Sequence, residues 1–167
     1  MKIDVALSTE WDNVETVRAS LEDILTRNHL CALTSIGPEG APHINTAYFA
    51  PLSSAELVFW TSPKSRHSQN LSANPAAAIA IYDSRQPWGS DLQGLQAHGS
   101  VRRATGITNI KAFGAYAARY AGLLKFAKAH DEADRIFESK FYVFHPDQIT
   151  VLDESRLGKE KYVVVKL

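Results

Sequence analysis

The chain has 167 residues, enough for one domain with a buried core, and its 45% hydrophobic and 22% charged content is ordinary for a globular protein. The formal net charge is zero, which argues against a nucleic-acid partner, because that function normally needs a basic excess. No segment approaches the roughly 18 consecutive apolar residues of a membrane span. The polar N-terminus is unlike a secretory signal, and a single cysteine excludes an internal disulfide. We therefore expect one domain over 1–167, cytoplasmic and without a membrane partner.

The first elements in chain order are a helix and a hairpin. Apolar residues recur at spacings of three and four within 13–28, which predicts an amphipathic helix, and Asp12 can cap its start. Residues 30–36 and 41–50 are typical of strands. The Gly-Pro-Glu-Gly sequence at 37–40 predicts the tight turn that joins them.

A third strand, a short helix and a fourth strand follow. Residues 56–61 contain the apolar run Leu-Val-Phe-Trp, which is typical of a buried strand. The Ser-Pro pair at 62–63 is a helix-start pattern, so we expect a helix over 63–73 that ends at the Asn-Pro pair 74–75. Residues 76–83 are predicted to form the next strand.

The remaining chain contains a long strand, a helical region and further strands. A loop over 84–91 precedes a strand over 92–103, in which small or apolar residues alternate with polar ones. The alanine-rich residues 107–130 predict a helix that Gly122 can interrupt, with a further helical turn over 131–139. The last strands are expected at 140–144, 148–152 and 162–167.

This order of elements predicts a mainly β fold with α elements (α+β). Six to eight short strands, mostly antiparallel and with helices set between them, favour a small barrel. The turns between the early strands are too short for crossover helices, which argues against a doubly wound parallel sheet.

The segment that follows the third strand is a candidate anion site. Lys64, Ser65, Arg66 and His67 fall in the first turn of the expected helix, where backbone N–H groups point outward. Cations are disfavoured at a helix N-terminus by the macrodipole, and a bound phosphate would resolve that conflict. The alternative is a solvated basic helix start.

Aromatic and amide side chains supply further candidates. Trp60 could stack on a flat ligand or fill the core, and Trp88 could cover a ligand or a partner from its Gly/Pro loop. Gln93 and Gln96, early in the long strand, could read the edge of a polar ring or belong to an ordinary exposed face.

Other kinds of chemistry find no support in the sequence. The histidines and Cys31 lack metal-ligand spacing, and no nucleophile motif is present, so we assign no metal site and no catalytic residue. Cys31 has apolar neighbours, which indicates a buried, inert thiol.

Taken together, these segments resemble the FMN-binding split β-barrel superfamily related to pyridoxamine 5'-phosphate oxidase. The resemblance rests on the turn GPEGAPH, the strand LVFWTS, the segment KSRHSQNL, the Asn-Pro stop, and the strands AIAIYD and GLQAHGSVRR. The C-terminal sequence from Phe141 to Leu167 is similar to a branch of that superfamily with a helical insert after the fifth strand.

The resemblance implies a split β-barrel of six to eight antiparallel strands that binds FMN at the interface of a homodimer. It also implies flavin-dependent oxidoreduction of a small molecule that the sequence does not identify. The family's phosphate segment corresponds to Trp60, Thr61, Lys64, Ser65, Arg66 and His67, its strand along the flavin to Asn45, Thr46, Ala47 and Tyr48, and its glutamine to Gln93 or Gln96. Trp88 would help to shape the substrate pocket.

Three departures from the oxidases narrow the expected activity. His67 stands where they usually carry lysine, no arginine lies near Asn45, and no tryptophan follows Trp88. The C-terminal Arg and Trp motif that recognises pyridoxal phosphate is therefore missing, so we expect a substrate other than pyridoxamine 5'-phosphate.

Three other functions remain open. The barrel could hold flavin or haem without turnover, and a haem would use His43, His67 or His98 as its ligand. It could instead bind the deazaflavin F420 through the same phosphate segment. It could also have lost its cofactor and retain only the dimer.

Overall fold

The computed structural model describes residues 13–52, 55–122 and 138–167. The expected cap Asp12, the continuation of the helix beyond Gly122 and the turn over 131–137 lie outside these residues. None of the helices in the described part of the chain combines the length and the apolar character needed to cross a membrane.

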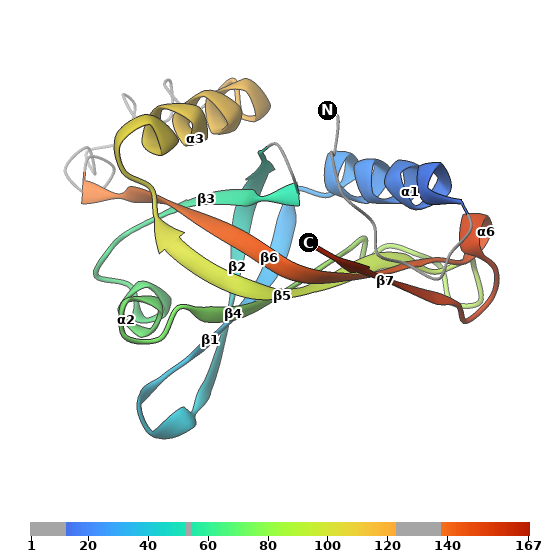
Figure 1. Cartoon of the computed structure of the whole chain (residues 1–167), viewed down its shortest axis with the longest axis horizontal. Coiled ribbons are helices and arrows are strands. Elements are labelled where there is room, and N and C mark those ends of the chain that lie inside the picture. The colour runs from blue at the N-terminus through green and yellow to red at the C-terminus, as the bar shows by residue number, and fades with distance from the viewer. Residues whose placement is uncertain (1–12, 53–54, 123–137) are drawn as a thin grey trace.

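The described elements are four helices and seven strands (Figure 1). The helices are α1 (Val14–Arg27), α2 (Arg66–Ala73), α3 (Gly106–Arg119) and α6 (Glu154–Leu157), with a 3₁₀ turn η1 (Pro38–Gly40). The strands are β1 (Leu30–Ile36), β2 (Pro42–Pro51), β3 (Leu57–Thr61), β4 (Ala76–Tyr82), β5 (Gln93–Arg103), β6 (Lys140–Asp153) and β7 (Tyr162–Lys166).

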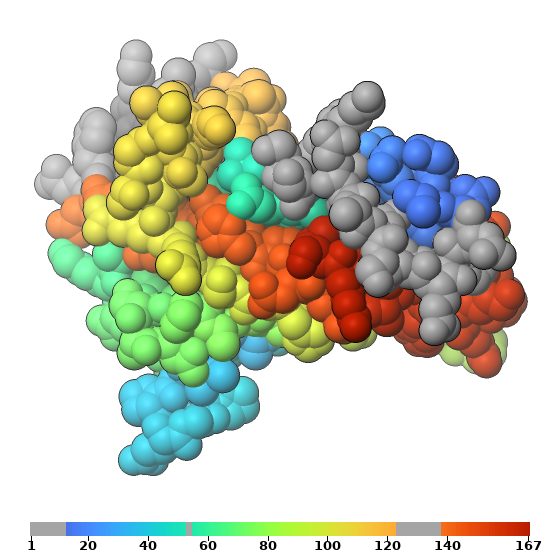
Figure 2. Space-filling view, viewed as in Figure 1, coloured from blue at the N-terminus to red at the C-terminus, as the bar shows by residue number. Residues whose placement is uncertain are grey.

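The strands form an antiparallel six-stranded barrel with one added strand, which confirms the predicted fold class. Their order is β3-β2-β1-β4-β5-β6-β7, and pairing of β3 with β6 closes the barrel. The β1–β2 hairpin projects from the body of the molecule (Figures 1 and 2). Closure leaves β7 outside the barrel, on the part of β6 that β3 does not reach.

Strand β6 is continuous, so the prediction of two separate strands at 140–144 and 148–152 was wrong. Pro146 lies within it, and the β5 register shifts opposite, between His98 and Gly99. Proline has no N–H for the ladder and is tolerated in a sheet at a bulge. A Cβ on Gly99 would lie 2.1 Å from the His145 carbonyl oxygen, so only glycine lets the two strands approach here.

The helix starts differ from the predictions by one to three residues. Helix α1 is capped by Asn13, whose side chain accepts the Thr16 N–H at 3.1 Å. Helix α2 begins at Arg66 rather than Pro63, because residues 62–65 form a turn closed by the Ser65 N–H on the Ser62 carbonyl at 3.1 Å. The short helix α6, capped by Asp153, was not predicted.

Helices α1 and α2 lie near opposite ends of β5. Near α1, the Gln93 side chain donates to Asp23 at 3.3 Å. Near α2, the Val101 N–H donates to the Pro75 carbonyl at 2.8 Å. Strand β5 has 11 residues, which at about 3.3 Å per residue separates these two ends by the length of the barrel.

The barrel interior holds the main core, and helix α3 covers a second, smaller one. Phe49, Phe59 and Phe144 are fully buried among the interior side chains. The second cluster joins α3 to the outward side chains of β2, β3 and β6, among them Val58 and Val143. Cys31 belongs to the interior core, which confirms its expected burial, and this burial raises the pKa of its thiol to about 12.

The outward face of the remaining strands carries exposed apolar side chains. Strand alternation and cross-strand pairing, which runs through β5 and β6, place them on one side of β2, β1, β4 and β7. They are Leu30, Ile44, Tyr48, Tyr82, Tyr162 and Val164, which we call the bare face.

Substitution of Gly99 tests the role of the bulge. In Gly99→Ala the new methyl group would meet the His145 carbonyl, so we expect the free energy of unfolding to fall by roughly 3 kcal/mol or more. Gly114→Ala is the matched control, since no described atom beyond its chain neighbours and the backbone of its own helix lies within 4 Å of its Cβ position on α3. It should stabilise the helix by about 0.5–1 kcal/mol. Equal effects of both in urea unfolding would contradict this account.

Candidate cofactor site

The junction of β3 and α2 brings two hydroxyl side chains to one imidazole. The Nε2 atom of His67 lies 2.7 Å from the Thr61 hydroxyl and 2.9 Å from the Ser65 hydroxyl. Ser65 is also the N-cap of α2, because its oxygen accepts the Ser68 N–H at 3.4 Å. Capping and side-chain bonds thus fix both hydroxyls at the start of the helix.

The histidine at this junction is held in its neutral form. Burial lowers the pKa of His67, and the neighbouring His43 lowers it further. The two rings lie nearly parallel, with centroids 6.5 Å apart and an interplanar angle of 5°. His43 comes from the start of β2, so this contact brings the turn end of the β1–β2 hairpin against α2. The sequence gives no local signal for it, because the rings belong to different elements.

The two cationic side chains at the β3–α2 junction, Lys64 and Arg66, differ in whether they already have a partner. Arg66 is exposed and makes no hydrogen bond or ion pair within the described residues. Lys64 pairs with Glu138 at 2.8 Å, and both side chains are largely exposed. An exposed ion pair of this kind adds little stability, so an arriving anion can recruit Lys64 at small cost.

The side chains of residues 45–48 of β2 alternate between the two faces of the sheet. Asn45 and Ala47 pair with the buried residues Leu33 and Cys31 and share their inward face, whereas Thr46 and Tyr48 point outward. The Oδ1 atom of Asn45 is buried and has no hydrogen-bond partner within the described chain. Such an oxygen costs about 1–3 kcal/mol unless a ligand or water supplies a donor.

The predicted aromatic candidates have different environments. Trp60 packs beneath α3, with its ring centroid 6.1 Å from Phe141 and 6.5 Å from Tyr116, so it is a packing residue in this structure. Trp88 lies in the loop between β4 and β5, and its side chain is fully exposed.

The two predicted glutamines, Gln93 and Gln96, also have different environments. The Gln93 amide donates to Asp153 at 3.0 Å, in a network that also holds Arg156 and Asp23. Burial raises the pKa of Asp153, but hydrogen bonds from Ser155, Gln93 and Arg156 outweigh it and bring the value to about 2. Gln96 is exposed on the outward face. Within one chain, Trp88 and Gln93 therefore lie far from α2.

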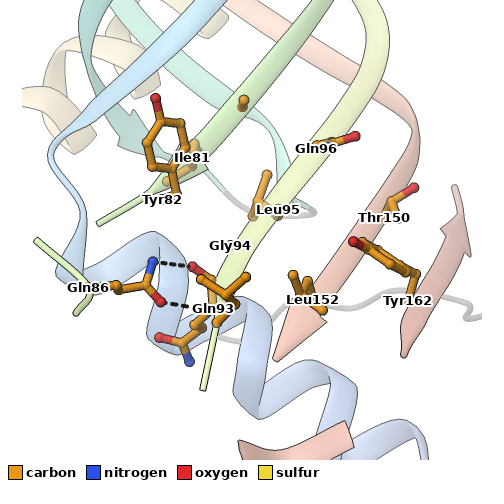
Figure 3. A pocket seen from close by; sticks show the side chains of 12 residues that line it. Ile81, Tyr82, Gln86, Gln93, Gly94, Leu95, Gln96, Thr150, Leu152 and Tyr162 are labelled. Atoms are coloured by element: carbon orange, nitrogen blue, oxygen red, sulfur yellow. Dashed lines mark hydrogen bonds between the residues drawn. The ribbon is translucent and has the colours of Figure 1, made fainter. Parts of the chain in front are cut away.

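A hollow of about 280 Å³ opens on the bare face near the start of β5 (Figure 3). Tyr82 and Tyr162 line it from β4 and β7, and Gly94 lies between them. A Cβ on Gly94 would come within 3.2 Å of Tyr82, so glycine leaves room here. Gln86 brackets the Gln93 backbone through both atoms of its amide, at 2.7 and 3.0 Å, and so fixes the rim.

The donors at the β3–α2 junction fit a phosphate group. Phosphate offers only acceptor oxygens, and the site offers the Thr61 hydroxyl, the first N–H groups of α2 and the Arg66 guanidinium. The Ser65 hydroxyl already donates to the Ser62 carbonyl at 2.8 Å. A metal ion is less suited, because no group of three or more His, Cys, Asp or Glu side chains that could hold one occurs in the described chain.

The family assignment follows from comparison with known sequences. The profile of the pyridoxamine 5'-phosphate oxidase family matches residues 17–153. The chain therefore belongs to this family, as its sequence resemblance predicted. The match ends where β6 ends, before α6 and β7. A search of curated proteins gives no match.

Solved structures share the fold at low sequence identity. A protein of unknown function from Agrobacterium tumefaciens superposes with a TM-score of 0.68 at 16% identity, over 84% of this chain and 57% of its own. A haem-binding protein from Mycobacterium smegmatis gives 0.64 at 16% identity, over 88% and 56%. An FAD-binding protein from Mesorhizobium loti gives 0.58 at 18% identity, over 78% and 90%. The chain spans little more than half the length of the first two.

The partly buried His67 imidazole makes the free energy of unfolding depend on pH in a predictable direction. Because the pKa of His67 is lowered in the folded state, the unfolded chain binds the proton first as the pH falls below about 6.5. The free energy of unfolding should therefore decrease on acidification through this range. His67→Gln should flatten that dependence in urea titrations at several pH values, whereas His98→Gln, at an exposed position of β5, should not. An unchanged profile in His67→Gln would refute this role.

Proposed function

We propose that the protein is an FMN-binding oxidoreductase whose phosphate anchor is the β3–α2 junction. The observation that carries this proposal is the donor set at that junction, with Thr61 and Ser65 oriented by neutral His67 and Arg66 left without a partner in the described chain. Family membership supports it, since a ligand phosphate at a strand–helix junction explains why cations gather there.

The protein residues would bind and orient the cofactor, which when bound supplies hydride or electron transfer. Arg66 would meet the phosphate with its planar fork, and Lys64 would add a point charge after leaving Glu138. Thr46 and Tyr48 face outward beside β1 and are the β2 side chains available to a ring on that face. The substrate is proposed to differ from pyridoxamine 5'-phosphate, because the Arg and Trp recognition motif is missing.

A second copy of the chain would complete the site. The apolar residues of the bare face are those that a stable dimer would cover. Trp88 and Gln93 lie at the end of β5 opposite α2, so they could reach a bound cofactor only from a partner. We therefore propose a homodimer with the cofactor at its interface.

A titration with FMN tests the cofactor and its anchor together. The wild-type protein should quench FMN fluorescence, and Arg66→Ala should weaken binding about tenfold or more through loss of a charge-assisted phosphate contact. Lys111→Ala is the control, since it removes an exposed cation on α3, which lies across the strands of the barrel from α2 (Figure 1). A protein that ignores FMN but shows a Soret band with haem, or binds F420, would replace this proposal with one of those functions.

Light scattering tests the proposed dimer. A chain of 18.4 kDa should behave as a particle of twice that mass at micromolar concentration. Ile44→Glu places a charge on the bare face, where this side chain is 66% exposed, and should give a monomer with weakened FMN binding. Ile107→Glu, at a position 71% exposed on α3, should remain dimeric. A monomeric wild type would overturn the shared site.

A further inference from the structure

Two imidazole rings meet where the turn end of the β1–β2 hairpin contacts α2. His43 of β2 and His67 of α2 are nearly parallel, with their ring centroids 6.5 Å apart. Both residues are partly buried, and no hydrogen bond or ion pair joins either ring to a carboxylate in the described part of the chain. Imidazoles change charge near neutral pH, so the protonation of this pair decides how much positive charge the junction carries.

The hydroxyl contacts of His67 show which of its ring nitrogens is open to a proton. A hydroxyl has one hydrogen, and Ser65 gives its own to the Ser62 carbonyl at 2.8 Å. The Nε2 atom of His67, 2.9 Å from the Ser65 oxygen, therefore carries the hydrogen of that contact. This tautomer leaves Nδ1 as an acceptor, to which no described residue donates a hydrogen bond. It also leaves the hydroxyl hydrogen of Thr61 free for an anion.

The charged groups beside the pair on its own helix leave a bound anion incompletely balanced. Arg66 precedes His67 in α2, is exposed, and has no ion pair within the described residues. Lys64, in the turn before the helix, is bound to Glu138 at 2.8 Å. A doubly charged oxyanion at this helix start would thus meet one unpaired cationic side chain from the turn and the helix.

The neighbouring strands face the pair with uncharged groups. Ser35 of β1 is the cross-strand partner of His43, and Thr61 of β3 contacts the other ring at 2.7 Å. Strand β5 adds Arg102 and Arg103, which line a hollow beside the last turn of α2 rather than the hydroxyls of the junction. The histidine pair is therefore the group in the described junction that could supply a second positive charge.

We propose that an oxyanion bound at the β3–α2 junction draws one proton onto the His43–His67 pair, which then serves as a positive charge of the site. The proton comes from solvent and is held at a ring nitrogen of the pair, with Nδ1 of His67 as the open position. Without an anion, burial and the neighbouring ring lower the pKa of His67 and keep it neutral. A nearby negative charge has the opposite effect and favours the imidazolium. The identity of the anion as the FMN phosphate rests on the proposed function, whereas the proton linkage does not.

The linkage gives anion binding a pH dependence of definite sign. Because the complex holds more protons than the free chain, its formation is favoured as the pH falls from about 8 to about 6.5. The free energy of unfolding of the ligand-free chain changes in the opposite direction over the lower part of this range. An anion should therefore protect the protein most at the pH where the neutral pair is least stable.

NMR titration of the histidine ring protons, with and without sulfate, tests the linkage in the full chain. Sulfate keeps its double charge throughout this pH range, whereas a phosphate monoester such as FMN itself takes up a proton with a pKa of about 6. Sulfate should raise the titration midpoint of the His67 ring by about one pH unit or more. Its affinity, read from the amide shifts of Arg66 and His67, should increase about threefold to tenfold between pH 8 and pH 6.5.

Calorimetry in buffers of different ionisation enthalpy counts the protons directly. About half a proton should be taken up per sulfate bound at pH 7, and His67→Gln should remove most of this uptake. His43→Gln removes the ring that opposes protonation of its neighbour, so it should raise the His67 midpoint in the ligand-free chain. Arg66→Ala should weaken sulfate binding but leave the uptake per bound sulfate unchanged. His98→Gln, at an exposed position of β5, is the matched control and should change none of these quantities.

The outcomes separate the proton linkage from the proposed cofactor. Sulfate that binds equally well at pH 6.5 and pH 8, without proton uptake, would overturn the linkage. Uptake that both His67→Gln and His43→Gln leave unchanged would place the proton elsewhere and would overturn it as well. Absence of any sulfate shift at the junction amides would overturn the anion site itself. Proton-linked sulfate binding by a protein that ignores FMN would support the linkage and refute only the proposed cofactor.

Discussion

The position of the candidate site depends on how β6 closes the barrel. One edge of β6 pairs with β5 along its whole length, and the other edge is divided between β3 and β7. The division falls at Pro146, where the ladder lacks an N–H and Gly99 allows the strands to approach. His145 is tied beside this point to Glu56, just ahead of β3, at 2.7 Å. Closure therefore aligns Thr61 with Lys140 and fixes where α2 starts.

At this end of the barrel, the inward side of the β3–α2 junction carries little formal charge. The neutral His67 orients Thr61 and Ser65 without placing a positive charge against the barrel. The formal charges of Lys64 and Arg66 remain at the surface, where ligand binding involves little desolvation. The resemblance to the oxidases implies a lysine at this position, and His67 supplies hydrogen bonds in its place. Under the proposed function, Arg66 would then provide most of the charge that recognises the phosphate.

Local patterns predicted most of the fold, and the errors have physical causes. Alternation and turn chemistry predicted β1 to β5 within about two residues. The break in β6 was misread because Pro146 ends strands unless a distant glycine accommodates it. The start of α2 was misread because Ser62-Pro63 and Ser65 are both capping patterns, and only the turn at 62–65 selects the second. The partners of Gln93 and the stacking of His43 on His67 are long-range contacts that no local pattern contains.

The predicted site residues lie in two groups at opposite ends of β5, and this separation bears on how the chain assembles. Thr46, Tyr48 and Gln96 are on the outward face of the sheet, whereas Asn45 and Ala47 are directed inward. Trp88 and Gln93 lie at the α1 end of β5, and the phosphate segment lies at the α2 end. One chain cannot bring both ends of a strand to one small molecule. In the proposed homodimer, a two-fold axis running across β5 would set the α1 end of one barrel against the α2 end of the other. The separation of the two groups within one chain is what this proposed shared site requires.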